Sequence, residues 1–262
     1  MMVKTCMRVI ITTLFTMACF HGLAQDSWLY PNKFIYPIGE KAEFILFAGE
    51  NFMGKPVELS QQKIENFTLY NKAGKQDLTA VANRADKNII TYLLNQIGTQ
   101  IIILQHNSAI AELNAEDLNK LITESLDAKV NSADEPASVL SSHFSKLLVQ
   151  VGKSTDETYK RKTGIELEIV PDSNPYAITS GDYLGCVVYY EGKPLPHSLV
   201  RVYSHIGNRI FLQNIYTEDD GSVKFPVSSK GPWMVSTVNI KKSDKPDVDY
   251  ERIWASLVFG IE

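Results

Sequence analysis

Short strand-like segments separated by turn residues dominate the second half of the sequence. Ile165, Leu167 and Ile169 alternate with Glu166 and Glu168, which is the period of a strand with one buried face. Six further apolar segments follow at even spacing, at 186–190, 199–203, 209–216, 223–227, 233–240 and 253–259. Seven short strands in a segment of this size predict one antiparallel β-sandwich.

The first half has the same character up to about residue 112. Strands are expected at 33–36, 41–48, 67–70, 88–94 and 99–106, and Asn71–Gly74 has the composition of a hairpin turn. The run Ile101–Leu104 is continuously apolar, which is typical of a central strand buried on both faces.

Between these β-rich halves the period changes. Leu118, Leu121, Ile122 and Leu126 recur at the spacing of one helix face, and Asn114 precedes them as an N-cap, with Asp117 three residues later.

A second helix is expected from Asp134–Pro136 to Gly152. Its predicted apolar face consists of Leu140, Phe144, Leu147, Leu148 and Val151.

These patterns predict a mainly β protein with two immunoglobulin-like or transthyretin-like β-sandwich domains joined by a short helical segment. The expected divisions are a signal peptide at 1–24, an N-terminal sandwich at 25–112, a helical connector at 113–163 and a C-terminal prealbumin-like sandwich at 164–262.

The N-terminus has the composition of a cleaved signal peptide. Lys4 and Arg8 precede an apolar run at 9–20 that is too short to span a bilayer, and Gly22–Ala24 supplies small residues for cleavage. An uncleaved anchor and lipidation at Cys19 are weaker alternatives. We therefore expect export to the periplasm, with the cell surface as the alternative, and no membrane span in the mature chain.

Charge and cysteine content limit the function classes. The net charge is −4 and no basic block is present, which argues against nucleic acid as a partner. Removal of the signal leaves only Cys186, which lies in an apolar strand-like run. It is therefore expected to be a small buried side chain rather than a catalytic thiol, and no intramolecular disulfide is expected.

The catalytic motifs of common enzyme classes do not occur in the sequence. It contains no Gly-x-Ser-x-Gly elbow, phosphate-binding Walker loop or Gly-x-Gly-x-x-Gly. We therefore expect a protein that is not an enzyme; a hydrolase with an unrecognised site is a third alternative.

Four histidines remain after the signal and are weak candidates for metal ligands: His106, His143, His197 and His205. None has another histidine at the spacing of a metal motif, so surface or strand-edge positions are the simpler expectation.

Two further features each have a functional and a structural interpretation. The acidic segment Glu218–Gly221 suits either calcium or, more simply, a hairpin turn. Trp28, Trp233 and Trp254 suit either sugar stacking or, more simply, a hydrophobic core.

Several segments resemble a known family in their order along the chain. They are Asp26–Pro31, Gly49–Pro56, Leu147–Gly152, Leu167–Pro171, Asn174–Ala177, Gly181–Asp182, Thr217–Gly221 and Trp254–Phe259. Together they resemble the exported bacterial family catalogued as domain of unknown function 4198, which is linked by name to NikM-like components of cobalt and nickel uptake. The resemblance implies nickel or cobalt as cargo and a membrane metal transporter as partner. Relatives often have histidine where this chain has Gln25 and Asn239.

The leading hypothesis is thus an exported, non-enzymatic binding or accessory protein of the bacterial envelope, associated with nickel or cobalt uptake. The alternative is an interaction module that binds protein or glycan through sheet edges and loops. Three convergent histidine or carboxylate side chains would favour the metal hypothesis, whereas an exposed aromatic surface would favour the alternative.

Overall fold

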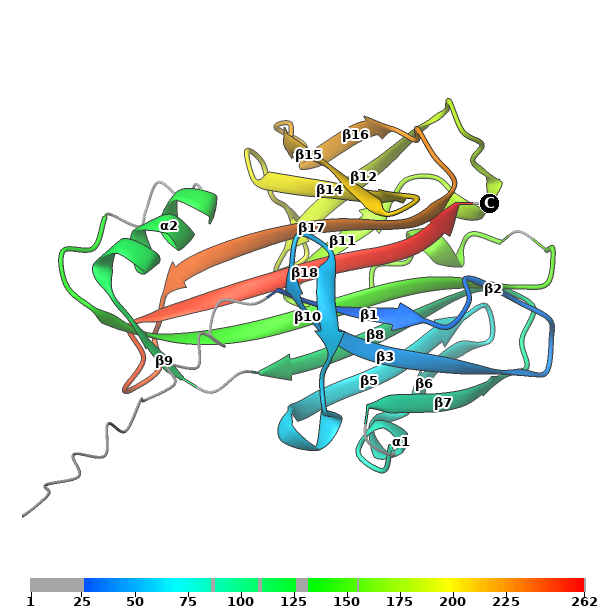
Figure 1. Ribbon diagram of the computed structural model, residues 1–262, viewed down its shortest axis with the longest axis horizontal. Helices are drawn as coiled ribbons and strands as arrows, with labels where there is room; N and C mark the ends of the chain where they lie inside the picture. Colours follow the sequence, from blue (N-terminus) through cyan, green and yellow to red (C-terminus); the bar gives the residue numbers. More distant parts are fainter. Residues whose placement is uncertain (1–25, 86–87, 108–109, 126–131, 155, 262) are drawn as a thin grey trace, which may run out of the picture.

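The computed structural model describes residues 26–85, 88–107, 110–125, 132–154 and 156–261, and the predicted signal peptide, with Cys19 and Gln25, lies outside them. The protein is mainly β (Figure 1). Its strands are β1 (Asp26–Pro31), β2 (Ile35–Tyr36), β3 (Glu40–Glu50), β4 (Met53–Pro56), β5 (Lys63–Asn71), β6 (Gly74–Asp77), β7 (Ile89–Leu94), β8 (Gly98–Asn107), β9 (Ala111–Leu113), β10 (Ala137–Val151), β11 (Leu167–Pro171), β12 (Tyr183–Tyr190), β13 (Lys193–Pro194), β14 (Leu199–Ile206), β15 (Arg209–Tyr216), β16 (Ser222–Pro226), β17 (Gly231–Lys242) and β18 (Tyr250–Ile261). The helices are α1 (Thr79–Ala82) and α2 (Ala115–Ser125), with 3-10 turns η1 (Leu59–Gln61), η2 (Thr158–Lys160) and η3 (Pro175–Ala177).

One long sheet forms the centre of the molecule. Its main path runs β15-β14-β17-β18-β10-β8-β5-β6, with β2 and β9 also paired to β10. Figure 1 shows β17, β18 and β10 as three long strands running side by side. A small sheet of β1, β3, β4 and β7 and another of β11, β12, β13 and β16 complete the β structure.

The small sheets pack against the long sheet and form two hydrophobic cores. One core joins β1, β3 and β7 to strands of the long sheet, and the other joins β11, β12 and β16 to that sheet. Strand β8 contributes to both, because Ile102 and Leu104 lie in the first core and Ile101 and Ile103 in the second. The prediction that this strand is central and buried on both faces is therefore confirmed.

The second predicted helix, from Asp134–Pro136 to Gly152, is wrong, because Ala137–Val151 is the long strand β10. Leu147 and Val149 face the first core, whereas Phe144 and Leu148 face the second. A strand buried on both faces has no alternation of apolar and polar residues, so its sequence does not show the strand period.

Two separate sandwich domains are not confirmed. The long sheet contains strands from both predicted sandwiches and, through β10, from the predicted connector. Strands β10 and β18 pair in parallel, with Val139 opposite Tyr250 and Leu147 opposite Val258. Two halves of the chain therefore share one continuous sheet.

The helix predicted after Asn114 is confirmed as α2. The Asp117 amide donates to Asn114 Oδ1 over 2.9 Å, as expected of an N-cap. Leu118, Leu121 and Ile122 are buried against the long sheet, while Leu126 lies outside the described residues.

The structural interpretations of the tryptophans and of Cys186 are confirmed. Trp28, Trp233 and Trp254 are all buried in the core. Cys186 is a buried free cysteine of β12, and burial raises the pKa of its thiol, which opposes thiolate chemistry.

The acidic segment is the predicted turn. The Gly221 amide donates to the Glu218 carbonyl over 2.9 Å, and Gly221 has a φ of +75°.

Candidate functional site

Two of the four candidate histidines lie together inside the protein. The register that pairs Leu148 of β10 with Ile101 of β8, continued along the two strands, brings His143 opposite His106. Their rings are stacked, with centroids 4.7 Å apart and planes 5° from parallel. The expectation of surface or edge positions is wrong for this pair, because His143 lies on a central strand rather than on a helix.

Ser27 of β1 connects the two rings. Its Oγ lies 3.0 Å from His106 Nε2 and 3.1 Å from His143 Nδ1. The hydroxyl has one proton, so it donates to one ring nitrogen and accepts from the other. The Ser27 carbonyl accepts from Trp254 Nε1 and from Ser256 Oγ of β18. This polar cluster thus ties β1, β8, β10 and β18 together.

Burial keeps both rings neutral at pH 7. It lowers the pKa of His106 to about 4. Burial, followed by the nearby His106 and Arg252, holds the pKa of His143 well below its usual range. Arg252 is itself buried and pairs with Asp26, with Nη2 2.9 Å from Oδ1.

This cluster is a poor fit for a resident metal ion. Neutral imidazoles are good ligands, but the described residues contain no group of three histidine, cysteine or acidic side chains able to hold a metal. Arg252 brings a positive charge, and none of the residues described accepts a hydrogen bond from its buried Nε and Nη1. The surroundings therefore disfavour a cation.

The other two histidines lie elsewhere, one before β14 and one within it. His197 is exposed, with Nε2 3.2 Å from Asp219 Oδ1. His205 lies edge-on to the ring of Phe52, with centroids 4.7 Å apart. The structure therefore does not bring the four candidates into one site.

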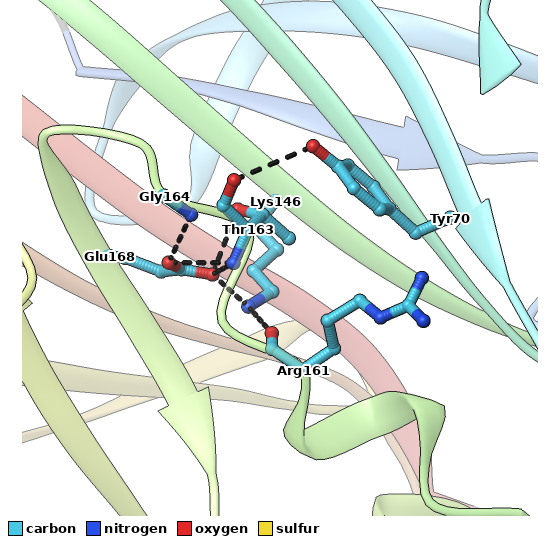
Figure 2. A network of polar contacts seen from close by, with 6 residues as sticks. All are labelled: Tyr70, Lys146, Arg161, Thr163, Gly164 and Glu168. Carbon is cyan, nitrogen blue, oxygen red and sulfur yellow. Dashed lines mark hydrogen bonds and ion pairs between the residues drawn. The ribbon is translucent and has the colours of Figure 1, made fainter. Parts of the chain in front are cut away.

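A second buried polar network joins the long sheet to its neighbour (Figure 2). Lys146 Nζ of β10 lies 2.7 Å from Glu168 Oε1 of β11, and both side chains are almost fully buried. The same carboxylate accepts from the Thr163 and Gly164 amides and from the Thr163 hydroxyl. Because Glu168 has donors on all sides, the network fastens the 161–164 segment to the sheet rather than offering a reactive group.

Two surface hollows lie apart from the histidine pair. A hollow of about 470 Å³ is lined by residues 133–137, Lys242, Asp249 and Tyr250. Another of about 580 Å³ lies beside β7 and is lined by Glu43, Val81, Arg84, Ala85, Ile89 and Thr91. Neither brings histidine and carboxylate side chains together.

The most exposed apolar feature of the long sheet is its edge strand β15. All eight residues of β15 pair with β14 in an uninterrupted register, and nothing in the described structure pairs with its other edge. Phe211, Leu212 and Tyr216 are 48%, 44% and 53% exposed, whereas phenylalanine and leucine are usually buried. The sequence analysis predicted this strand but not its position at the edge of the sheet. Edge strands are often marked by charged residues, and this strand has none after Arg209.

The opposite edge of the same sheet is different. Strand β6 has only four residues, and its exposed Lys75 and Asp77 are charged. Short, charged edges resist pairing with other chains, so β6 is protected in a way that β15 is not.

Comparisons with known proteins identify a family but no activity. The family model of DUF4198, a domain of unknown function, matches residues 23–241. No curated protein matches the sequence. Trypsin-activated α2-macroglobulin from Escherichia coli is 12% identical with a TM-score of 0.21, and the match covers 89% of this chain and 24% of that one. A tetra-tandem repeat from the extending region of a large adhesion protein is 10% identical with a TM-score of 0.24, covering 91% and 74%.

The chain spans about a quarter of the length of the α2-macroglobulin that it matches. In the part of the chain that is described, no helix has the length and apolar character needed to cross a bilayer.

Proposed function

This chain belongs to the DUF4198 family, and we propose that it is an exported, non-enzymatic binding protein of the cell envelope that receives an extended polypeptide at strand β15. The observation that carries the proposal is the long, exposed and unprotected edge of the central sheet. The N-terminal sequence supports export to the periplasm, with the cell surface as the alternative.

The side chains of β15 support docking rather than protection. Folded proteins usually block sheet edges with proline, a bulge, charges along the strand or a covering segment. Strand β15 has neither proline nor bulge, and its only charge is Arg209 at its start. An apolar edge of this kind suits β-strand addition, in which main-chain hydrogen bonds supply affinity and side-chain contacts supply specificity.

The hairpin turn sets which backbone groups face outward. Ile206 and Arg209 flank the two-residue turn Gly207–Asn208, so the Arg209 amide is directed toward β14. Because amides alternate in direction along an antiparallel strand, those of Ile210, Leu212, Asn214 and Tyr216 face away from the sheet. They are the groups that an added strand would pair with.

Site-specific photo-crosslinking in the native host tests this proposal. A benzophenone side chain in place of Leu212 should crosslink to a discrete polypeptide, and the same group in place of Gln76 on β6 should not. Mass spectrometry of the product identifies the polypeptide. Equal crosslinking from the two positions, or none from position 212, would overturn the proposal.

Nickel or cobalt carriage is the second candidate, because the stacked pair of neutral imidazoles supplies two ligands of a suitable kind, although the described residues add no third ligand and Arg252 adds a positive charge. Calorimetric titration of the chain from Gln25 onward with nickel, cobalt, zinc and calcium tests it. Carriage requires stoichiometric binding that His106→Ala weakens and His197→Ala does not. Because of Arg252 and the missing third ligand, we expect no stoichiometric binding of any of the four ions. Binding that depends on His106 would instead make metal carriage the working function.

A further inference from the structure

We propose that the polypeptide received by β15 is the β15 strand of a second copy of this chain, paired antiparallel across a two-fold axis. The inference rests on the proposed docking role of this edge and names its partner. It is carried by the distribution of apolar and charged residues along and just beyond the strand.

The apolar residues match in an antiparallel pairing centred on Gln213. Phe211 of one copy then lies opposite Ile215 of the other, and Ile210 lies opposite Tyr216. In this register Leu212 of one copy lies opposite Asn214 of the other. The backbone amides of both residues face away from their own sheets, so the two strands can form hydrogen bonds with each other. Phe211 lies on one face of the strand and Leu212 and Tyr216 on the other, so the second strand covers exposed side chains on both faces.

The charges distinguish antiparallel from parallel pairing. The strand begins at exposed Arg209 and is followed by the exposed acidic turn Glu218–Asp220. Antiparallel pairing places Arg209 of each copy opposite Thr217 of the other, and so beside the acidic turn. Parallel pairing would place arginine beside arginine and acid beside acid, which is unfavourable.

The same geometry closes the assembly at two copies. A two-fold contact uses the same patch on both copies and leaves no second patch to continue a fibre. The remaining end of each long sheet is β6, whose short charged edge resists further pairing.

Sedimentation equilibrium of the chain from Gln25 onward tests the inference, because that segment contains every described element. The wild type should dimerise. Arg209→Glu places like charges beside each other at both ends of the contact and should raise the dimer dissociation constant about tenfold or more. Glu218→Lys should raise the dimer dissociation constant in the same way, because it changes the other partner of the same charge pair. Lys75→Glu on β6 should leave the dissociation constant unchanged.

Mixing the two charge variants provides the decisive control. In a mixed pair, the new glutamate of one copy lies beside the new lysine of the other, and the native Arg209 lies beside the native Glu218. The mixture should therefore dimerise about as tightly as the wild type, whereas each variant alone dimerises about tenfold or more weakly. This recovery cannot arise from misfolding of either variant.

A wild type that stays monomeric at high micromolar concentration, or a dimer that responds equally to Arg209→Glu and Lys75→Glu, would overturn the inference. These outcomes leave the docking role separately testable. Crosslinking from position 212 to a different polypeptide supports β15 as a docking edge but rejects self-pairing, and the absence of any crosslink rejects both.

Discussion

Replacing Glu168 by glutamine should lower the free energy of unfolding by about 3–5 kcal/mol, the usual cost of removing one partner from a buried ion pair. Lys146 would keep its buried position without a carboxylate, and burial already lowers the pKa of its ammonium group. Urea denaturation at pH 7 measures the change.

A matched control lies two residues earlier. Glu166 pairs with Lys241 over 3.1 Å, but both side chains are about one-third exposed. Glu166→Gln should therefore cost less than about 1 kcal/mol. Adding Lys146→Met to Glu168→Gln should recover much of the lost free energy of unfolding, because the unpaired buried charge of Lys146 is then removed. Equal effects of the two glutamate substitutions would contradict a stabilising role of the buried pair.

Acid should destabilise the protein between pH 6.5 and 4 through the histidine pair. The folded pKa of His106 is about 4, below its unfolded value near 6.5, so the unfolded chain binds more protons in this range. The free energy of unfolding keeps its full value above pH 6.5. It decreases as the pH falls from 6.5 to 4, by roughly 3 kcal/mol for His106. His143 shifts in the same direction. Urea denaturation at stepped pH measures the slope.

The charged groups around the pair do not produce this slope. Arg252 and Asp26 are paired with each other. Exposed carboxylates with lowered pKa values, such as Asp182 and Asp220, act mainly below about pH 4. His106→Gln should flatten the slope between pH 6.5 and 4, and His197→Gln on the surface should not. An unchanged slope in His106→Gln would show that the cluster does not control acid stability.

The sequence predicted most strands because their residues alternate or are bounded by turn residues. It also predicted α2, because Asn114 and Asp117 form a local cap whose spacing is visible in the chain. It failed at β10, because Leu140, Phe144, Leu147 and Val151 have the spacing of a helix face. Phe144, Leu147 and Val151 lie instead on a strand between two cores, where burial on both faces removes the alternation.

The polar clusters could not be predicted for the same reason. With 137–151 interpreted as a helix, His143 and Lys146 had no defined neighbours on adjacent strands. Glu168 alternates with apolar residues in the sequence, a pattern typical of a strand with one buried face, yet it is buried against Lys146. Ser27 and His106 are distant in sequence, and only the tertiary packing of β1 against the long sheet brings them together.

The parallel pairing of β10 and β18 also determines how the chain must fold. The segment β11–β17 separates these two strands in the sequence. The centre of the long sheet therefore depends on contacts between residues that are distant in the sequence, and such contacts form slowly. Until β18 arrives, the whole edge of β10 that it later covers remains open to misassembly. A ribosome-bound chain that stops before β18 therefore cannot complete its central sheet. Such late closure would favour passage through a secretion channel in an unfolded state, as the proposed export requires.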